Sequence, residues 1–274
     1  MTGHESWVPT DTDTSKANTA RVYDYWLGGS HNFRADQDVA RALIAVEPNI
    51  RAVARANRAF MMRAVRFMAG AGVRQFLDVG SGIPTEQNVH QVAQEAAPGS
   101  RVVYVDNDDV AVSHSRLLLD GNPDAAAVHA DLRDPAKILG DPATRSLIDF
   151  GQPVGLLLTS VLHFLADTDE PHRLVAEFRD ALAPGSYLLI SHGTREAKQE
   201  VGQAFETVYN NRVSNSAQVR PRDQIARFFD GFTLVEPGLV YTPLWRPEPG
   251  AELPGDPRDF WLLAGVGVRD GAGD

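Results

Sequence analysis

The residues with the clearest chemical potential form a glycine-rich segment, FLDVGSGIPT, at positions 76–85. A short apolar run leads into Gly80, Ser81 and Gly82, and a helical pattern follows from Thr85. Glycines allow the backbone to turn tightly and allow a ligand to approach the main chain. The first N–H groups of a helix behind such a turn lack partners within the helix and attract polar or anionic groups. The segment therefore favours a ligand-binding turn over a purely structural one.

An acid at the end of the next apolar run strengthens this interpretation. The run RVVYVD, residues 101–106, ends in Asp106, which lies 24 residues after Gly82. A carboxylate about 20 residues past a glycine turn, at the carboxyl end of a strand, can accept hydrogen bonds from both ribose hydroxyls. Asp106 could instead cap the following helix, but Asn107 and Asp108 can supply that cap themselves. We therefore expect Asp106 to be free for a ligand.

Short apolar runs separated by helical patterns must position these residues. Seven runs predict strands, at residues 74–80, 101–106, 126–131, 154–160, 186–192, 232–240 and 260–268. Helices are expected at 36–46, 49–69, 85–96, 109–119, 135–149, 171–182, 195–211 and 221–229. This alternation predicts an α/β fold with a seven-stranded, mainly parallel sheet and helices on both faces. Only a proline-rich loop joins the last two strands, which indicates an antiparallel last strand.

The chain before residue 73 differs from the rest. Residues 1–18 are polar and are expected to form a flexible tail. Residues 19–72 are expected to form a lid segment and two helices, and residues 73–270 a single ligand-binding core. The segment RVYDYWLGGSHNF, residues 21–33, is dense in aromatic side chains around a Gly-Gly turn. These side chains could cover a ligand or simply anchor the arm to the core, because aromatic residues bury a large area in either case.

The composition excludes several classes of protein. The chain has 274 residues, a net charge of −10 and no cysteine. Without cysteine there are no disulfides, thiolate metal sites or cysteine nucleophiles, and the acidic balance disfavours nucleic acid as a partner. No apolar leader and no apolar stretch long enough for a membrane span is found. We therefore expect a cytoplasmic protein with no membrane partner. No metal is expected either, because the histidines are scattered singly.

The motifs together carry a resemblance. D-V-G-S-G at 78–82, V-D at 105–106 and A-D-L at 130–132 resemble the motifs of class I S-adenosylmethionine-dependent methyltransferases, over about residues 74–268. More narrowly, RVYDYWLGGSHNF followed by FLDVGSGIPT resembles an actinobacterial family of such methyltransferases, formerly catalogued as a domain of unknown function. This second resemblance covers nearly the whole chain. It implies S-adenosylmethionine as cofactor and methyl transfer as the activity, and it names no acceptor, which we expect to be a small molecule.

The resemblance also implies roles for matching residues. Asp78 would orient the turn or meet the methionine amino group, Asp106 would hold the ribose, and Asp131 would lie at the adenine. Pro84 departs from the family pattern, because many relatives carry a glycine there, and we expect it to shift the start of the following helix. The full set of implied cofactor-binding residues is Asp78, Gly80, Ser81, Gly82, Asp106, Asn107, Asp131, Leu132, Thr159 and Ser160.

Three residues are candidates for chemistry on the acceptor. His163 follows the fourth predicted strand and is the first candidate for a general base, since open α/β sheets bind ligands at the carboxyl ends of their strands. His192, at the end of the fifth strand, is the second. Tyr23 lies in the aromatic segment and could orient the acceptor. The competing interpretation is that each histidine only bonds a neighbouring carbonyl and that Tyr23 only anchors the arm.

Two other functions stay open at this point. The first is a non-catalytic protein that binds S-adenosylmethionine. The second is an NAD(P)-dependent oxidoreductase, which the glycine spacing disfavours because Thr85 replaces the third glycine of the dinucleotide fingerprint. The sequence lacks the N/D-P-P-Y/F motif of methylases that act on exocyclic amines of bases; it reads LTSVLHF after the fourth strand. The oligomeric state cannot be read from these patterns.

Overall fold

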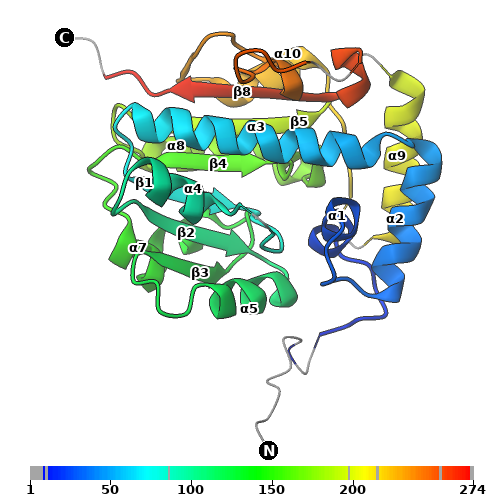
Figure 1. The fold of residues 1–274 in the computed structure, drawn as a ribbon, viewed down its shortest axis with the longest axis horizontal. Helices are drawn as coiled ribbons and strands as arrows, with labels where there is room; N and C mark the ends of the chain where they lie inside the picture. The colour runs from blue at the N-terminus through cyan, green and yellow to red at the C-terminus, as the bar shows by residue number, and fades with distance from the viewer. Residues whose placement is uncertain are drawn as a thin grey trace, which may run out of the picture.

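The centre of the fold is a twisted sheet with helices on both faces (Figure 1). The structure is a computed structural model that describes residue 9 and residues 12–85, 87–196, 198–213, 216–252 and 255–271. The strand order across the sheet is β3-β2-β1-β4-β5-β8-β6, and β7 also pairs with β8. The strands are β1 (Gln75–Val79), β2 (Arg101–Asp106), β3 (Ala125–His129), β4 (Gly155–Thr159), β5 (Tyr187–Gly193), β6 (Thr233–Leu234), β7 (Val240–Tyr241) and β8 (Leu262–Val268).

The direction of the strands follows the prediction. Strands β1 to β5 run parallel, and β8 runs antiparallel to β5 with Tyr187 opposite Val268. The central strands are apolar on both faces, as is usual for parallel strands that helices cover on both sides. The order of the parallel strands reverses between β1 and β4. Ligands of open α/β sheets bind beside such a reversal, at the carboxyl ends of the strands.

The predicted continuous strand at 232–240 is wrong. The structure has only β6 and β7 there, two residues each, and both pair antiparallel with β8. Pro237 and Gly238 lie between them, and Gly238 has a φ of +82°. Proline has no N–H to donate to a sheet, and glycine at positive φ turns the chain. The apolar run therefore forms a turn between two short strands.

Prolines also explain two differences among the helices. The predicted helix at 135–149 is interrupted at Asp141 and Pro142, because proline clashes with the preceding helical turn. The helix expected from 85 begins only at Val89, after Pro84 and a cap formed by Asn88. The α-helices are α1 (Thr19–Leu27), α2 (Arg34–Val46), α3 (Ile50–Gly70), α4 (Val89–Ala96), α5 (Asp109–Leu118), α6 (Pro135–Gly140), α7 (Pro142–Leu147), α8 (Pro171–Ala181), α9 (Gln199–Arg212) and α10 (Arg222–Ala226).

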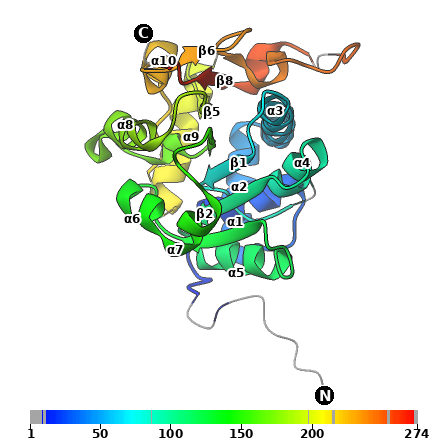
Figure 2. The same cartoon turned by 90° about the vertical axis from the view of Figure 1, so that its left-hand side faces the viewer.

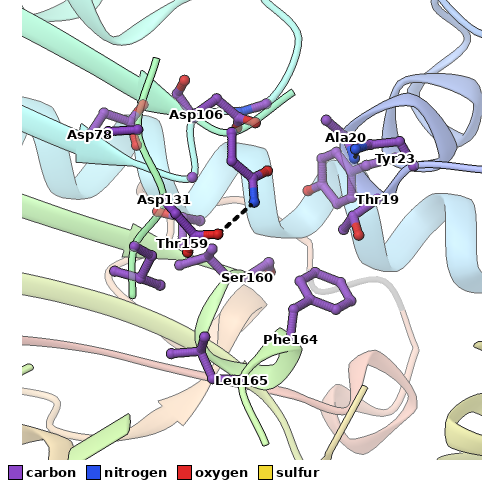
Figure 3. A pocket seen from close by; sticks show the side chains of 18 of the residues that line it. Thr19, Ala20, Tyr23, Asp78, Asp106, Asp131, Thr159, Ser160, Phe164 and Leu165 are labelled. Carbon is purple, nitrogen blue, oxygen red and sulfur yellow. Dashed lines mark hydrogen bonds between the residues drawn. The ribbon is translucent and has the colours of Figure 1, made fainter. Parts of the chain in front are cut away.

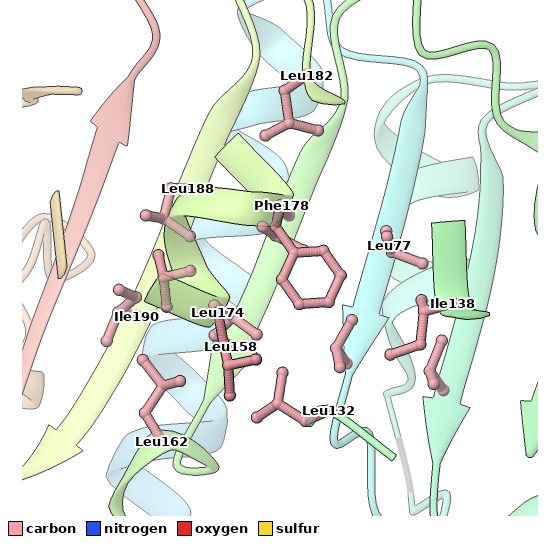
Figure 4. Packing of buried hydrophobic residues seen from close by; sticks show 14 of the residues in the cluster. Leu77, Leu132, Ile138, Leu158, Leu162, Leu174, Phe178, Leu182, Leu188 and Ile190 are labelled. Atoms are coloured by element: carbon pink, nitrogen blue, oxygen red, sulfur yellow. The ribbon is translucent and has the colours of Figure 1, made fainter. Parts of the chain in front are cut away.

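Two apolar layers hold the sheet. One lies between the sheet and α6, α7 and α8, where Phe178 packs among leucines of β1, β4 and β5 (Figure 4). The other lies between the opposite face and α3 and α4, where Phe60, Met68 and Phe76 are completely buried. Figure 2 shows these two groups of helices on either side of the strands. No helix in the described part of the chain is long and apolar enough to cross a membrane.

The N-terminal helices stand beyond the carboxyl ends of the parallel strands. Helices α1 and α2 pack there with α9 around a third apolar cluster that includes Trp26 and Phe205 (Figure 1). The predicted tail at 1–18 lies mostly outside the described residues. Of its described part, Ala17 forms a bridge with Val213 and Asn18 caps α1. The N-terminal segment that includes α1 and α2 therefore lies over the edge of the sheet at which ligands are expected.

Candidate functional site

A cavity opens between α1, α3 and the carboxyl ends of β1, β2 and β4, with about 910 Å³ of empty space that includes space open to solvent. Figure 3 shows carboxylates of the sheet on one side of the cavity and α1, with Thr19, Ala20 and Tyr23, on the other. Tyr23 and all ten residues predicted to bind the cofactor line it: Asp78, Gly80, Ser81, Gly82, Asp106, Asn107, Asp131, Leu132, Thr159 and Ser160.

The glycine turn is held by the neighbouring strand. The backbone N–H groups of Gly80 and Ser81 both donate to the carbonyl of Val105, at 2.8 and 3.1 Å. Gly80 has a φ of +73° and Gly82 a φ of +67°. A Cβ on Gly80 would lie 2.3 Å from Cγ2 of Val161, whereas a Cβ on Gly82 would meet no atom within 4 Å. Gly80 is therefore required by packing, and Gly82 borders open space of the cavity.

We expect the two glycines to respond differently to alanine. Gly80→Ala should destabilise the fold by about 2 kcal/mol or more, because a positive φ and a steric clash act together. Gly82→Ala should cost only about 1 kcal/mol of stability, from its φ alone. Its methyl group would enter the cavity and should weaken S-adenosylhomocysteine binding instead. Thermal unfolding and calorimetric titration of both variants test this, and an equal loss of stability in the two would contradict the assignment.

Asp106 is buried, and its carboxylate is not as free as the sequence indicated. Oδ2 accepts from the backbone N–H of Gly82 at 2.7 Å, and Oδ1 accepts from that of Asp108 at 2.9 Å. The helix cap comes from Asp108, whose side chain accepts from Ala111 N at 3.0 Å. Burial raises the pKa of Asp106 to about 6, although these backbone donors oppose the shift. Each oxygen keeps a second lone pair, so the carboxylate can still accept from a diol.

Asp78 lies deeper, at the end of β1. It is 3% exposed, and burial raises the pKa of its carboxyl to about 7, while the guanidinium of Arg58 opposes the shift. Asp131 is half-buried, and its Oδ2 accepts from Nδ2 of Asn107 at 3.3 Å, the contact drawn as a dashed line in Figure 3. Leu132 beside it is buried. The cavity thus has two buried acids, Asp78 and Asp106, at its inner end. Further along, it has the polar side chain of Asp131 and the apolar side chain of Leu132.

A polar network at the end of β4 was not foreseen from the sequence. Asn57 of α3 donates from Nδ2 to the hydroxyl of Tyr23 at 3.0 Å and to that of Ser160 at 2.9 Å. Tyr23 in turn donates to the carbonyl of Ala54 at 3.1 Å. Ser160 has a φ of +52°, a strained value for a residue with a side chain. The only sequence signal for Asn57 was an amide on the apolar face of a predicted helix.

Some residues that line the cavity have buried polar atoms with no hydrogen-bond partner in the described part of the chain. Oδ1 of Asn57 and Oγ1 of Thr159 are among them. Buried polar atoms are almost always hydrogen-bonded, and exceptions call for an explanation. Both atoms would be satisfied by a polar ligand in the cavity. The donors and acceptors present therefore fit a ligand with hydroxyl and amino groups.

The two candidate histidines lie outside this cavity. His163 is 6% exposed, and its Nδ1 accepts from the N–H of Gly193 at 3.4 Å. Burial lowers its pKa to about 3, and the positive charge of Arg220 acts in the same direction. His192 is completely buried between the carbonyl of Gly193 and the guanidinium of Arg220. Their catalytic roles stay predictions, and no group of acids and histidines in the described part of the chain is arranged to hold a metal ion.

The strand order and the glycine turn define a class of protein. A mainly parallel sheet with an antiparallel strand next to β5, and with an acid near the carboxyl end of β1 and of β2, is the fold of class I methyltransferases. The chain belongs to the S-adenosyl methyltransferase family, whose sequence model matches residues 5–270. No curated protein matches the chain.

Solved structures agree with this assignment. The chain is 41% identical to a protein from Thermobifida fusca described as a "putative methyltransferase", with a TM-score of 0.91 over 97% of this chain and 99% of that one. It is 38% identical to a DUF574 family protein from Streptomyces avermitilis, with a TM-score of 0.90 over 94% and 99% of the two chains. An O-methyltransferase family protein from Burkholderia thailandensis shares the fold at 15% identity and a TM-score of 0.52, over 82% of this chain and 61% of that one.

Proposed function

We propose that this chain transfers a methyl group from S-adenosylmethionine, bound in the cavity beside α1 and α3, to a small-molecule acceptor. The observation that carries the proposal is the convergence on one cavity of all ten residues that the family resemblance implies. Family membership and the unpartnered polar atoms of Asn57 and Thr159 in the wall support it independently. A protein that binds the cofactor but transfers no methyl group would have the same cavity, so only a measurement of turnover distinguishes it from an enzyme.

Each of these residues would contact the part of the cofactor that suits the chemistry of its side chain. Asp106 would accept from the ribose hydroxyls while its remaining lone pairs keep the glycine turn in place. Leu132 and Asp131 would contact the adenine, one through its apolar surface and one through its carboxylate. Asp78 would face the amino group of the methionine part, and Thr159 Oγ1 would gain the partner that it lacks in the protein alone.

The chain's own contribution to methyl transfer is alignment and exclusion of water. Bound S-adenosylmethionine supplies an electrophilic methyl group on a sulfonium. Helix α1 covers the cavity through Thr19, Ala20 and Tyr23, which limits access of water to the reacting atoms. Tyr23 and Ser160 are fixed by Asn57, so the wall next to the methyl group is rigid before binding. Holding two reactants in line is itself a large part of catalysis for such a displacement.

The affinity for S-adenosylhomocysteine should depend on pH through Asp78. An ammonium group beside Asp78 favours its carboxylate, whose pKa is about 7 in the free protein. Binding should therefore strengthen as the pH rises to about 7 and then level off. Titrations from about pH 5 to 8 test this, and Asp78→Asn should remove the dependence near pH 7 and leave a weaker one near 6 from Asp106. A wild-type affinity that is flat over this range would contradict the role of Asp78.

The same carboxyls set a pH dependence of stability in the free protein. Both hold a proton more tightly in the folded chain than in the unfolded chain, since burial raises their pKa values. Stability from these groups is therefore greatest at low pH and is lost as the pH rises towards 7. Bound S-adenosylhomocysteine should offset this loss.

The proposed function is tested first by calorimetric titration with S-adenosylmethionine, S-adenosylhomocysteine and NAD. We expect binding of the two sulfur ligands and none of NAD. Binding of NAD alone would overturn the proposal in favour of an oxidoreductase, and binding of none of the three would overturn it outright. Slow release of S-adenosylhomocysteine in the presence of small-molecule extracts would then separate an enzyme from a protein that only binds the cofactor.

A further inference from the structure

A second cavity adjoins the first, with about 380 Å³ of empty space that includes space open to solvent. The two share Tyr23, Ser160 and Phe164 in their walls, so these side chains stand between them. The second cavity reaches from this shared wall into the cluster formed by α1, α3, α9 and the start of β8. A molecule in it would face the end of the first cavity at β4, where Thr159 and Ser160 lie.

The lining of the second cavity is aromatic and uncharged. Trp26, Phe205 and Trp261 form its far wall, with Phe205 centred 6.5 Å from Trp26 and 5.2 Å from Trp261. Among the described residues that line it, none is an acid, a lysine or an arginine. Transfer of a charged group into such surroundings is strongly unfavourable without a partner charge. Flat rings, in contrast, pack well against aromatic walls.

Two polar side chains of this cavity, Tyr23 and Ser160, lie in the shared wall. The network of Ser160 leaves one hydrogen to donate. Oγ of Ser191 accepts the backbone N–H of Ser160 at 3.0 Å, and it lies 3.2 Å from Oγ of Ser160. Asn57 Nδ2 donates to the same oxygen. Either hydroxyl of this pair can donate; when Ser191 donates, Oγ of Ser160 accepts twice and its own hydrogen is available to a ligand.

His163 offers a second donor. The N–H of Gly193 points at Nδ1, so Nδ1 is the acceptor and the ring hydrogen is on Nε2. The ring lines the second cavity and is neutral, since burial keeps its pKa far below its ordinary value. A neutral imidazole with its acceptor nitrogen occupied can donate a hydrogen bond and is not free to take a proton. The far wall adds one more donor, the indole Nε1 of Trp261, which is buried without a partner.

We propose that the second cavity binds the methyl acceptor, and that this acceptor is an uncharged, planar aromatic molecule whose phenolic hydroxyl lies at the shared wall between Ser160 and His163. The inference rests on the proposed function and names the substrate class for it. The phenol would bind uncharged and lose its proton to solvent only as the methyl group is transferred, and donors at the wall would stabilise the partial negative charge that develops on its oxygen.

The transfer step then balances without a protein base. The phenolic oxygen forms a bond to the methyl carbon as the bond from that carbon to sulfur breaks, and the phenolic proton leaves to solvent. Sulfur keeps the electron pair and becomes an uncharged thioether, so the products are an aryl methyl ether and S-adenosylhomocysteine. Free phenols of this kind ionise near pH 10. The rate should therefore follow the pKa of the phenol used, with no step that follows titration of His163.

The test uses 2-naphthol and 4-phenylphenol as probes and 2-naphthoate as the matched anion. Each is titrated into protein that has been saturated with S-adenosylhomocysteine, and formation of 2-methoxynaphthalene from S-adenosylmethionine is followed by mass spectrometry. We expect at least one phenol to bind about tenfold or more tightly than the carboxylate, because the cavity offers no charge partner. Phenols that bind no better than 2-naphthoate, or not at all, would overturn the inference.

Two substitutions in the wall of the second cavity test whether the phenol binds there. Ala54→Leu and Val53→Phe add bulk on α3, where both residues line only the second cavity. Each should weaken phenol binding by about tenfold or more and leave S-adenosylhomocysteine affinity within about twofold. Ala59→Leu, on an exposed position of the same helix, is the matched control. If Ala54→Leu fails to fold, the phenol affinity of Val53→Phe and the affinities of the wild-type protein for the three probes still test the inference.

The outcomes separate the two proposals. Unchanged phenol binding in both filled variants would place the phenol elsewhere and overturn the inference, while the proposed function stands on S-adenosylhomocysteine binding alone. Failure of the wild-type protein to bind S-adenosylhomocysteine would overturn the proposed function and the inference with it.

Discussion

Replacing Asp106 with alanine is expected to weaken S-adenosylhomocysteine binding by about 1.5–3 kcal/mol, or about 10- to 150-fold. Two effects add. The ribose hydroxyls would lose a carboxylate acceptor, and hydrogen bonds to charged groups are among the stronger ones. The backbone N–H groups of Gly82 and Asp108 would lose their acceptor, so the glycine turn would no longer be fixed against β2. Calorimetric titration measures the loss directly.

Two further variants separate these effects. Asp106→Asn keeps one acceptor oxygen and should give an intermediate affinity. Asp109→Ala removes a neighbouring acid that is exposed at the start of α5 and lies outside the cavity, so it should bind like the wild type. If Asp106→Ala and Asp109→Ala bind equally well, Asp106 does not contact the ligand.

The parts of the site that the sequence predicted are those encoded within a few residues. A strand, a glycine turn and an acid at the next strand end are local patterns, and parallel strands bring their carboxyl ends to one edge. The fold therefore follows once the alternation of strands and helices is recognised. That is why the sequence alone predicts that Gly80, Gly82 and Asp106 lie at one site.

Residues that depend on long-range packing were missed. Asn57 lies on α3 and meets Ser160 across 103 positions of the chain, and no local pattern marks an amide for that contact. The strand predicted at 232–240 failed for a related reason. Its apolar residues suit a strand, but Pro237 and Gly238 break the ladder, and only the presence of β8 decides which short pieces pair.

The two histidines show that the sequence can predict where a side chain lies along a strand but not what surrounds it. The sequence indicated that His163 and His192 follow parallel strands, and it could not indicate how deeply each is buried. Both are surrounded by apolar groups and by the guanidinium of Arg220, which keep them neutral. That arginine comes from an irregular segment between α9 and α10, where single-sequence patterns carry the least information.

Replacing Arg220 with alanine is expected to lower the free energy of unfolding by about 3 kcal/mol or more. The guanidinium is completely buried and donates to the carbonyls of Leu162 and Leu165 at 3.1 and 2.9 Å and to Nε2 of His192 at 3.1 Å. Its ion pair with Asp167 contributes little, because that carboxylate is 68% exposed. The large effect comes from the acceptors left buried without partners, each of which costs about 1–3 kcal/mol.

Urea unfolding followed by circular dichroism measures this loss, with Arg173→Ala as the control because Arg173 forms exposed ion pairs within α8. Arg220→Lys should recover little of the stability, since one ammonium cannot reach the same spread of acceptors as a planar guanidinium. The segment that Arg220 holds carries Phe164 and Leu165, which line the first cavity. Arg220→Ala should therefore also weaken S-adenosylhomocysteine binding. An unfolding midpoint equal to that of Arg173→Ala would show that this buried cation does not support the site.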